Sequence, residues 1–259
     1  MKGCENACPR NAESSYMPVF LAGLSQARSL GAFNRLPVYA VSHQEGHIMA
    51  GLLHNLELMH KDRFLAVHFS GGTSEILEVS RSTGAHGFDI RLLSGGLDLH
   101  AGQLIDRVGV AMGLPFPSGK HMEELAQKSS GSDLHPIPTF VRPEGFSFSG
   151  AETRALAMVA KGVPHEDIAF AVLRCLANTL EKIILIHAGE RNIKDVLLVG
   201  GVMANSLIKE RLCRRLEHPG VGLKLSFADP RLSSDNAVGV AMLAAYLHNG
   251  ALGQLGTQG

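Results

Sequence analysis

The chain has 259 residues, enough for one large domain or two small ones, and its 45% hydrophobic and 19% charged residues are an ordinary globular balance. Its formal net charge is zero, which argues against a freestanding nucleic-acid-binding protein, because such proteins usually carry a clear basic excess. No apolar run reaches the roughly 18 residues that span a bilayer, and the polar N-terminus is no secretory signal. We therefore expect a cytoplasmic protein with no membrane partner.

Helical periodicity predicts a first helix from Met17 to about Asn34. Residues 37–41 then have the composition of a short buried strand. Ser42 is expected to cap a second helix, which carries His43 and His47 and continues to residue 56.

The rest of the chain alternates strands and helices. A helical middle over about 100–190 separates two groups of predicted strands. This order predicts α/β architecture with at least one partly parallel sheet. The strands are expected at 64–69, 75–80, 88–93, 195–199 and 223–227, and the later helices near 204–205 and over 235–248.

The most informative local feature is the segment His43-Gln44-Glu45-Gly46-His47. Histidines four residues apart lie on one face of a helix, so their imidazoles can converge on one metal ion. A third ligand is needed, and the loop 233–236 (SSDN) before the last helix is a good place for it. The zinc-protease motif does not fit, because Gln44 stands where it needs glutamate and Glu45 projects roughly 200° around the helix from His43. Plain packing of the two histidines remains the alternative.

Two predicted strands end in glycine pairs, in Ser70-Gly71-Gly72 and in Gly200-Gly201. Glycine permits a sharp turn and a close approach to a ligand, and free N–H groups there can hold a phosphate. Two such turns favour a nucleotide held between two halves of the chain, with ordinary tight turns as the alternative. Asp106 is a candidate for binding a ribose hydroxyl, but an ion pair with Arg107 or Arg154, or exposure to water, explains it equally well.

Other reactive residues have simpler explanations. Four cysteines form no disulfide framework in a chain of this size, and the spacing of Cys4 and Cys8 is unusual for metal ligands. One predicted helix gathers basic side chains into a local patch, for which a solvated helix face is the favoured interpretation. These are Lys209, Arg211, Arg214 and Arg215.

Taken in order, seven motifs resemble those of the tRNA threonylcarbamoyltransferase family (TsaD), formerly called glycoprotease or O-sialoglycoprotein endopeptidase. The resemblance covers about residues 17–248. The motifs are HQEGH at 43–47, FSGG at 69–72, AGQLID at 101–106, GLPFPSG at 113–119, FSFSG at 146–150, GGVMAN at 200–205 and SSDN at 233–236.

The resemblance implies an actin-like, sugar-kinase-like ATPase fold, with two α/β lobes around a nucleotide cleft. It implies transfer of a threonylcarbamoyl group from threonylcarbamoyl-AMP to N6 of adenosine 37 in tRNA, with one divalent metal ion, iron or zinc. By resemblance, the metal ligands are His43, His47 and Asp235. The substrate-binding residues are Ser70, Gly71, Gly72, Thr73, Ser74, Asp106, Gly119 and Asn205.

Several positions depart from the family pattern. The chain begins after the usual leading strand and acidic loop, so the first lobe is expected to be incomplete. Thr73-Ser74 replaces the usual His-Thr, Gln103 replaces a glutamate, and Ala151-Glu152 replaces Leu-Lys. These departures are typical of a divergent paralogue.

We accordingly expect a partial N-terminal lobe over 1–95, a helical insertion and central region over 96–190, and a C-terminal lobe over 191–259. The first hypothesis is a TsaD-like transferase that acts on tRNA through a complex. A non-catalytic partner that forms a homodimer or heterodimer with a paralogous subunit is the second. The historical metalloendopeptidase activity is the third.

Overall fold

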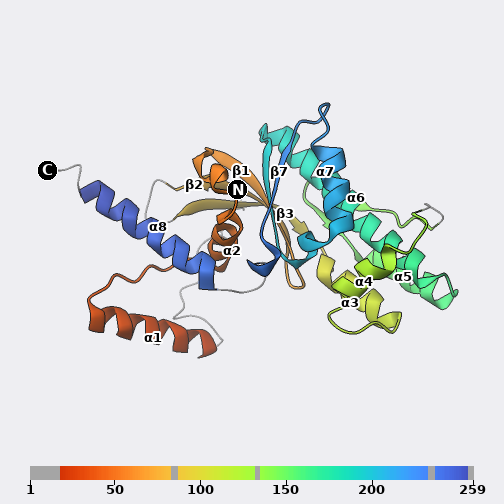
Figure 1. Cartoon of the computed structure of the whole chain (residues 1–259), viewed down its shortest axis with the longest axis horizontal. Coiled ribbons are helices and arrows are strands. Elements are labelled where there is room, and N and C mark those ends of the chain that lie inside the picture. Colours follow the sequence, from red (N-terminus) through yellow and green to blue (C-terminus); the bar gives the residue numbers. More distant parts are fainter. Residues whose placement is uncertain (1–17, 83–86, 132–134, 233–236, 256–259) are drawn as a thin grey trace.

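The structure is a computed structural model that describes residues 18–82, 87–131, 135–232 and 237–255. Its centre is one seven-stranded sheet in the order β4-β5-β3-β2-β1-β6-β7, with helices on both faces (Figure 1). The strands are β1 (Arg63–Phe69), β2 (Ser74–Arg81), β3 (Phe88–Gly96), β4 (Phe140–Arg142), β5 (Gly145–Ser147), β6 (Asp195–Val199) and β7 (Lys224–Phe227).

The sheet is mixed, as expected. β1, β2 and β3 form an antiparallel meander, whereas β6 pairs in parallel with β1, and β7 pairs in parallel with β6. The parallel pairing of β1 with β6 brings their carboxyl ends to one edge. Because both strands end in glycine turns, this edge is where two motifs far apart in the sequence meet.

One face of the sheet carries the larger core. It is covered by α3 to α7, and the long α6 contributes fully buried side chains such as Leu176, Leu180 and Ile183. The helices are α3 (Ala101–Ala111), α4 (Gly119–Ala126), α5 (Ser149–Ala160), α6 (His165–Arg191) and α7 (Ser206–Leu216).

The other face carries a smaller core beneath α2 (His43–Leu52) and α8 (Ala237–Leu255). Strand side chains alternate between the two cores. In β1, Leu65 and Val67 belong to the larger core, while Phe64 and Ala66 belong to the smaller one. Three short 3-10 helices complete the described elements, at Leu56–His60, Gly201–Ala204 and Pro230–Leu232.

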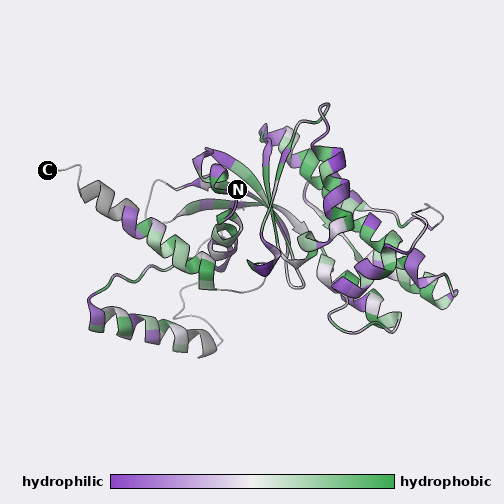
Figure 2. Ribbon diagram, in the orientation of Figure 1, coloured by the Kyte–Doolittle hydropathy of each residue, from purple (hydrophilic) through white to green (hydrophobic). Residues whose placement is uncertain are grey.

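The helix α1 (Pro18–Asn34) lies apart from the sheet. Figure 2 shows hydrophobic segments along it, and Phe33 is 87% exposed. The predicted strand at 37–41 is wrong: this segment has no regular secondary structure and pairs with no strand within the described residues, and Val38 is 46% exposed. The β4–β5 hairpin was not predicted, because its strands are too short for a periodic pattern.

Each of the three predicted segments, 1–95, 96–190 and 191–259, contributes strands to the one sheet. The division of the chain into lobes at 95 and 190 stays a prediction. Among the described helices, none is both long enough and apolar enough to cross a membrane.

Candidate functional site

The helix that carries the histidine pair begins where the sequence predicts. Ser42 has an extended backbone and its side chain accepts a hydrogen bond from the Glu45 N–H, while the Glu45 carboxylate accepts one from the Ser42 N–H. This reciprocal capping box fixes the first turn of α2. Glu45 is buried, and one of its carboxylate oxygens is engaged in the cap.

The geometry of the histidine pair suits one metal ion. His43 Nε2 and His47 Nε2 lie 3.1 Å apart, and the two ring centroids are 4.5 Å apart. Two nitrogens bound to one zinc or iron ion at roughly 2.0–2.1 Å lie about 2.9–3.4 Å apart at octahedral to tetrahedral angles. The pair therefore fits two positions of a single coordination sphere.

The third ligand implied by the resemblance, Asp235, lies outside the described residues. Within the described ranges, no group of three or more histidine, cysteine, aspartate or glutamate side chains is assembled that could hold a metal ion. The helix that follows Asp235 nevertheless crosses α2 closely, because a Cβ built on Gly239 would lie 1.9 Å from the Gly46 carbonyl oxygen. Only a glycine permits this crossing.

A third histidine adjoins the pair, and the sequence analysis missed it. His68 in β1 is only 4% exposed, and its ring centroid is 4.8 Å from that of His47. Its cross-strand neighbour Glu75 accepts a hydrogen bond from Gln44 of α2. A histidine within an apolar strand, two residues before a glycine turn, was the available signal.

The turn after β1 has the open backbone that was predicted. The Ser70 hydroxyl accepts hydrogen bonds from the N–H groups of Gly72 and Thr73, and the Ser70 N–H donates to the Thr73 carbonyl. Gly71 and Gly72 are exposed, and a Cβ on either would meet no atom within 4 Å. The two glycines therefore border open space.

The second glycine turn lies directly against the first. Gly200 has a φ of +99°, and a Cβ built on it would lie 2.2 Å from the Phe69 carbonyl oxygen. Only glycine fits both the conformation and the contact. The two glycine turns thus lie side by side, and the nucleotide that they favour stays a prediction.

Ser74 has a structural task. It is 1% exposed, and its hydroxyl accepts a hydrogen bond from the Ala101 N–H at the start of α3. In the same helix, a Cβ on Gly102 would lie 2.7 Å from the Gly71 Cα. The amino end of α3 is thus joined to the glycine turn, while Thr73 lies partly exposed beside it.

Asp106 and Gly119 are brought together by a loop. The Asp106 carboxylate accepts a hydrogen bond of 2.7 Å from the Ser118 N–H, and Gly119 opens α4 directly afterwards. Within the described part of the chain, Asp106 forms an ion pair with neither Arg107 nor Arg154, and Arg107 pairs with Glu152 instead. Asn205 is 6% exposed and caps α7, its side-chain oxygen accepting the Ile208 N–H.

A second aspartate in this region was missed. Asp98 accepts hydrogen bonds from the Ser147 and Ser149 hydroxyls and from the Phe148 and Leu99 N–H groups. Burial opposes ionisation of Asp98, but these hydrogen bonds together outweigh it and hold the pKa of the carboxyl well below its ordinary value. The carboxylate joins the loop before α3 to the FSFSG segment before α5.

Two of the departures from the family pattern have local partners. The Gln103 side chain accepts a hydrogen bond from the His100 N–H at the start of α3. Glu152 forms an ion pair of 3.2 Å with Arg107. Both substitutions are therefore accommodated by the fold.

Curated relatives share most of the described chain. A tRNA N6-adenosine threonylcarbamoyltransferase from Thermus thermophilus is 34% identical over 230 residues, which is 88% of this chain and 66% of that protein. A probable bifunctional tRNA threonylcarbamoyladenosine biosynthesis protein from Methanobrevibacter smithii is 32% identical over 225 residues, which is 87% of this chain and 39% of that protein. The chain thus spans less than two thirds of the length of either relative, 66% of the Thermus protein and 39% of the Methanobrevibacter protein.

Solved structures resemble the fold. The crystal structure of HypF from T. kodakarensis superposes with a TM-score of 0.63 at 17% identity, over 87% of this chain and 39% of that one. HypF in its phosphate- and nucleotide-bound form gives 0.59 at 13% identity, over 84% and 36%. At such identity the likeness concerns the fold alone, and it confirms the predicted α/β class of the actin-like ATPases.

The family comparison covers the same motifs that form the site. Residues 17–242 match the family described as TsaD: tRNA N6-adenosine threonylcarbamoyltransferase. This span includes the histidine helix and both glycine turns. Because the match extends over most of its length, the chain belongs to the TsaD family.

Proposed function

We propose that this protein transfers a threonylcarbamoyl group from threonylcarbamoyl-AMP to N6 of adenosine 37 in tRNA, using one divalent metal ion, iron or zinc. One observation carries the proposal. The histidine pair touches β1 through the contact between His47 and His68, and β1 leads two residues later into the glycine turn that meets Gly200. The histidine pair, as candidate metal ligands, and an open backbone turn therefore lie at one edge of the sheet.

His43 and His47 would hold the metal, with Asp235 as the third ligand. The chain offers a short path for that aspartate, because Gly239, four residues further on, is in contact with Gly46 in the turn between the two histidines. Four residues span at most about 14 Å. When bound, the cation would stabilise negative charge that develops at the carbamoyl carbonyl and on the leaving phosphate.

The backbone of the first glycine turn would hold the acyl-phosphate end of the substrate. Gly71 and Gly72 leave open space at a strand end, and Ser70 keeps the turn in shape through its two hydrogen bonds. Thr73 and the buried Ser74 belong to the same segment, Ser74 acting from below by fixing the start of α3. The Gly71 N–H takes part in none of the hydrogen bonds within the turn, and a backbone N–H at such a position suits a phosphate.

Asp106, Gly119 and Asn205 would contact the adenosine. The Asp106–Ser118 hydrogen bond fixes the loop that leads into Gly119, so a ribose contact and an adenosine contact would be positioned together. The Asn205 oxygen caps α7, and its amide nitrogen keeps two donors that this cap does not use.

A second candidate is a non-catalytic paralogue that binds another subunit. The observation that favours it is the exposed apolar side of α1 and the following segment, where Leu30, Phe33 and Leu36 are 64%, 87% and 64% exposed. Such a surface is typical of an interface with a paralogous subunit or a second copy. Metalloendopeptidase activity has less support, because Glu45, the carboxylate between the histidines, is used by the helix cap.

The proposed reaction would take place in the cytoplasm, on tRNA, in a complex that supplements the RNA affinity of a chain with zero formal net charge. The test is transfer of threonylcarbamoyl from threonylcarbamoyl-AMP to unmodified tRNA, with metal content measured by elemental analysis. We expect about one iron or zinc ion per chain and measurable transfer, both lost in His43→Ala. Wild-type protein that holds metal and binds tRNA but transfers nothing, with paralogous subunits added, would favour the non-catalytic alternative.

A further inference from the structure

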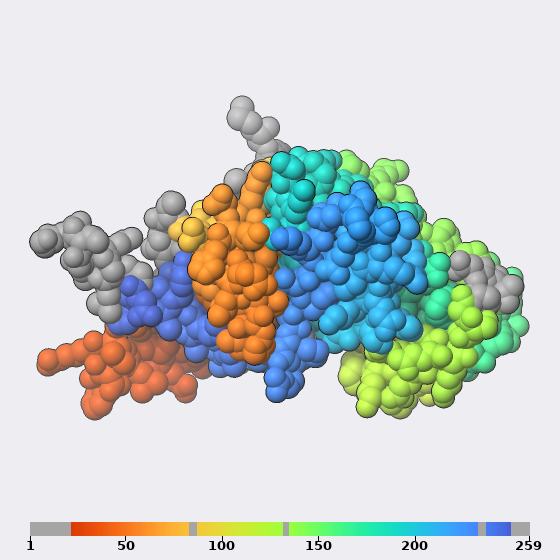
Figure 3. All heavy atoms as spheres, turned by 45° about the horizontal axis from the view of Figure 1, so that its top comes forward, coloured from red at the N-terminus to blue at the C-terminus, as the bar shows by residue number. Residues whose placement is uncertain are grey.

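A cavity between α6 and α7 is distinct from the site above. Its volume is about 440 Å³, and α7 lies on the face of the molecule seen in Figure 3. We call it the arginine cavity. Its lining residues are Gly131, Phe170, Leu173, Arg174, Ala177, Leu207, Glu210, Arg211 and Arg214.

The lining is cationic. Three arginines, Arg174, Arg211 and Arg214, line the cavity, whereas Glu210 is its one acidic lining residue among those described. Burial lowers the pKa of Arg211, and the nearby charge of Arg174 lowers it further, with only Glu181 opposing them strongly. Arginine stays protonated in proteins, so the lowered pKa of Arg211 reflects mutual repulsion among crowded cations. A bound anion would relieve this repulsion.

One carboxylate beneath the cavity holds part of this charge. Glu181 is 8% exposed and pairs with Arg211 at 3.2 Å and with Arg215 at 2.8 Å. These pairs fix the α6–α7 contact, and Arg211 keeps a buried Nε without a hydrogen-bond partner in the described structure. Arg174 and Arg214 reach the cavity from the two opposite helices, which is the arrangement that grips a tetrahedral anion from two sides.

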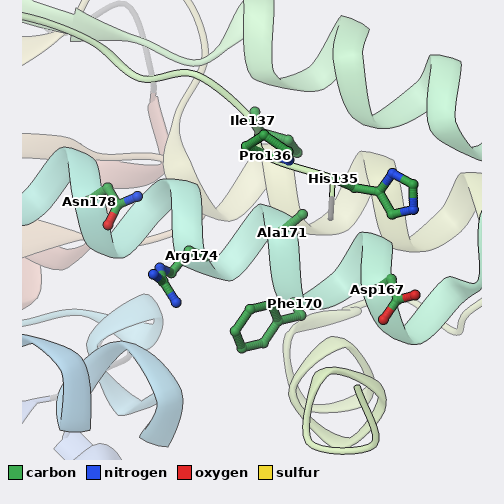
Figure 4. Close-up of a pocket in the computed structure, with 8 residues that line it drawn as sticks. All are labelled: His135, Pro136, Ile137, Asp167, Phe170, Ala171, Arg174 and Asn178. Carbon is green, nitrogen blue, oxygen red and sulfur yellow. The ribbon is translucent and has the colours of Figure 1, made fainter. Parts of the chain in front are cut away.

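A second, smaller cavity of about 210 Å³ adjoins the first and shares Phe170 and Arg174 with it (Figure 4). Phe170 and Arg174 project to the same side of α6, with the Arg174 guanidinium carbon 5.9 Å from the ring centroid. Asn178 also lines this cavity, and its buried side-chain oxygen has no hydrogen-bond partner within the described residues. An aromatic ring and an amide beside a cationic cavity suit one nucleotide unit of a single strand, with its phosphate in the larger cavity and its base in the smaller one.

We propose that the arginine cavity binds a backbone phosphate of the RNA substrate, with Arg174 and Arg214 as the contacting side chains and Arg211 as the cation fixed beneath by Glu181. This inference rests on the proposed action on tRNA. It also accounts for RNA affinity in a chain whose formal net charge is zero, because the required positive charge is gathered locally.

The test compares tRNA binding by wild type, by Arg174→Gln/Arg214→Gln and by Lys120→Gln/Lys161→Gln. The control removes the same charge from two exposed lysines that do not line either cavity. Binding is measured over a series of salt concentrations, with circular dichroism and thermal unfolding to verify the fold. The arginine variant should bind about tenfold more weakly at low salt and lose about one to two units of the slope of log K against log salt, while the control changes less than about threefold.

Three outcomes would overturn the inference. The arginine variant binds tRNA as the control does, or it loses affinity for a free adenine nucleotide and keeps its affinity for tRNA, or wild type binds no tRNA. Transfer activity is scored separately. Wild type that transfers threonylcarbamoyl while the arginine variant binds tRNA normally would remove the cavity from recognition and leave the proposed function standing. Arginine-dependent tRNA binding without transfer would support the role of the cavity in recognition and count against the proposed transfer function.

Discussion

The two faces of the sheet differ in how they combine stability with ligand-binding groups. The face under α3 to α7 holds the larger core, and its helices are joined by buried side chains and ion pairs such as those of Glu181. The face under α2 and α8 holds the smaller core, yet it carries the histidine pair. We call the face under α3 to α7 the thick layer and the face under α2 and α8 the thin layer. The thick layer fixes the strand ends and their glycine turns, and the thin layer brings the candidate metal ligands to them.

The histidine helix belongs to the smaller core, where its buried side chains Ile48, Met49 and Leu52 lie on the face away from the solvent. α2 is fixed by its capping box, by the close crossing of Gly46 with Gly239, and by the Gln44–Glu75 hydrogen bond to β2. The histidine side chains themselves add little to the core, because His43 is exposed and His47 is only half-buried. Substitutions can therefore separate ligand binding from folding on this face.

The largest expected effect is on metal binding. His47→Ala removes one nitrogen of the pair and should abolish stoichiometric metal content, while changing the free energy of unfolding of the metal-free protein by less than about 1 kcal/mol. Elemental analysis and denaturant unfolding measure the two quantities. His54→Ala, at a mostly exposed histidine beyond the end of α2, is the matched control. Full metal stoichiometry in His47→Ala would show that the pair is not the metal site.

The two cores are compared by shortening one fully buried leucine in each. Leu180→Ala in α6 should lower the free energy of unfolding by about 3–5 kcal/mol, and Leu243→Ala in α8 by about 2–3 kcal/mol. The void that Leu180→Ala leaves is enclosed, because Leu180 is fully buried. In α8, where Val238 and Val240 are 39% and 43% exposed, the helix can shift to fill the void that Leu243→Ala leaves. Equal losses in urea unfolding would contradict the distinction between a thick and a thin layer.

Asp106 tests whether the thick layer also contributes to nucleotide binding. Asp106→Ala should weaken the binding of an adenine nucleotide by about tenfold, because it removes the proposed ribose contact and the hydrogen bond that fixes Ser118. Calorimetric titration measures this. Arg107→Ala, one residue away at a surface ion pair, should leave nucleotide affinity unchanged. Unaltered binding by Asp106→Ala would remove this residue from the pocket.

The smallest effect is a pH dependence in the thick layer. His187 in α6 is buried and hydrogen-bonded to Ser94 at 2.9 Å. Burial lowers its pKa, Glu190 opposes this, and Arg191 adds to it. Below the unfolded value of about 6.5, the unfolded chain takes up a proton before the native ring does, so this residue's contribution to stability is lost as pH falls.

His187→Gln should flatten the fall in stability between about pH 7 and pH 5, because glutamine takes up no proton in either state. Thermal unfolding across this range measures the slope. His121→Gln, at a partly exposed histidine on α4, is the control and should keep the wild-type slope. A slope in His187→Gln as steep as in wild type would exclude His187 as its source.

The sequence by itself determined the elements with strong local signals. Ser42 indicates the start of α2, and continuous apolar runs indicate β1 and β6, which lie where they were expected. The histidine spacing also determined that the pair shares one helix face, because that depends only on helical geometry. These features require no knowledge of distant parts of the chain.

Only the tertiary structure decided which distant segments meet. The segment 37–41 has a strand-like composition but no strand pairs with it in the described structure, since pairing depends on a neighbour rather than on propensity. The contact of His68 with His47, the approach of Gly200 to Phe69, and the grouping of Arg174 with Arg214 all join residues from different elements. Such contacts follow from packing across the sheet and between helices, which no local pattern records.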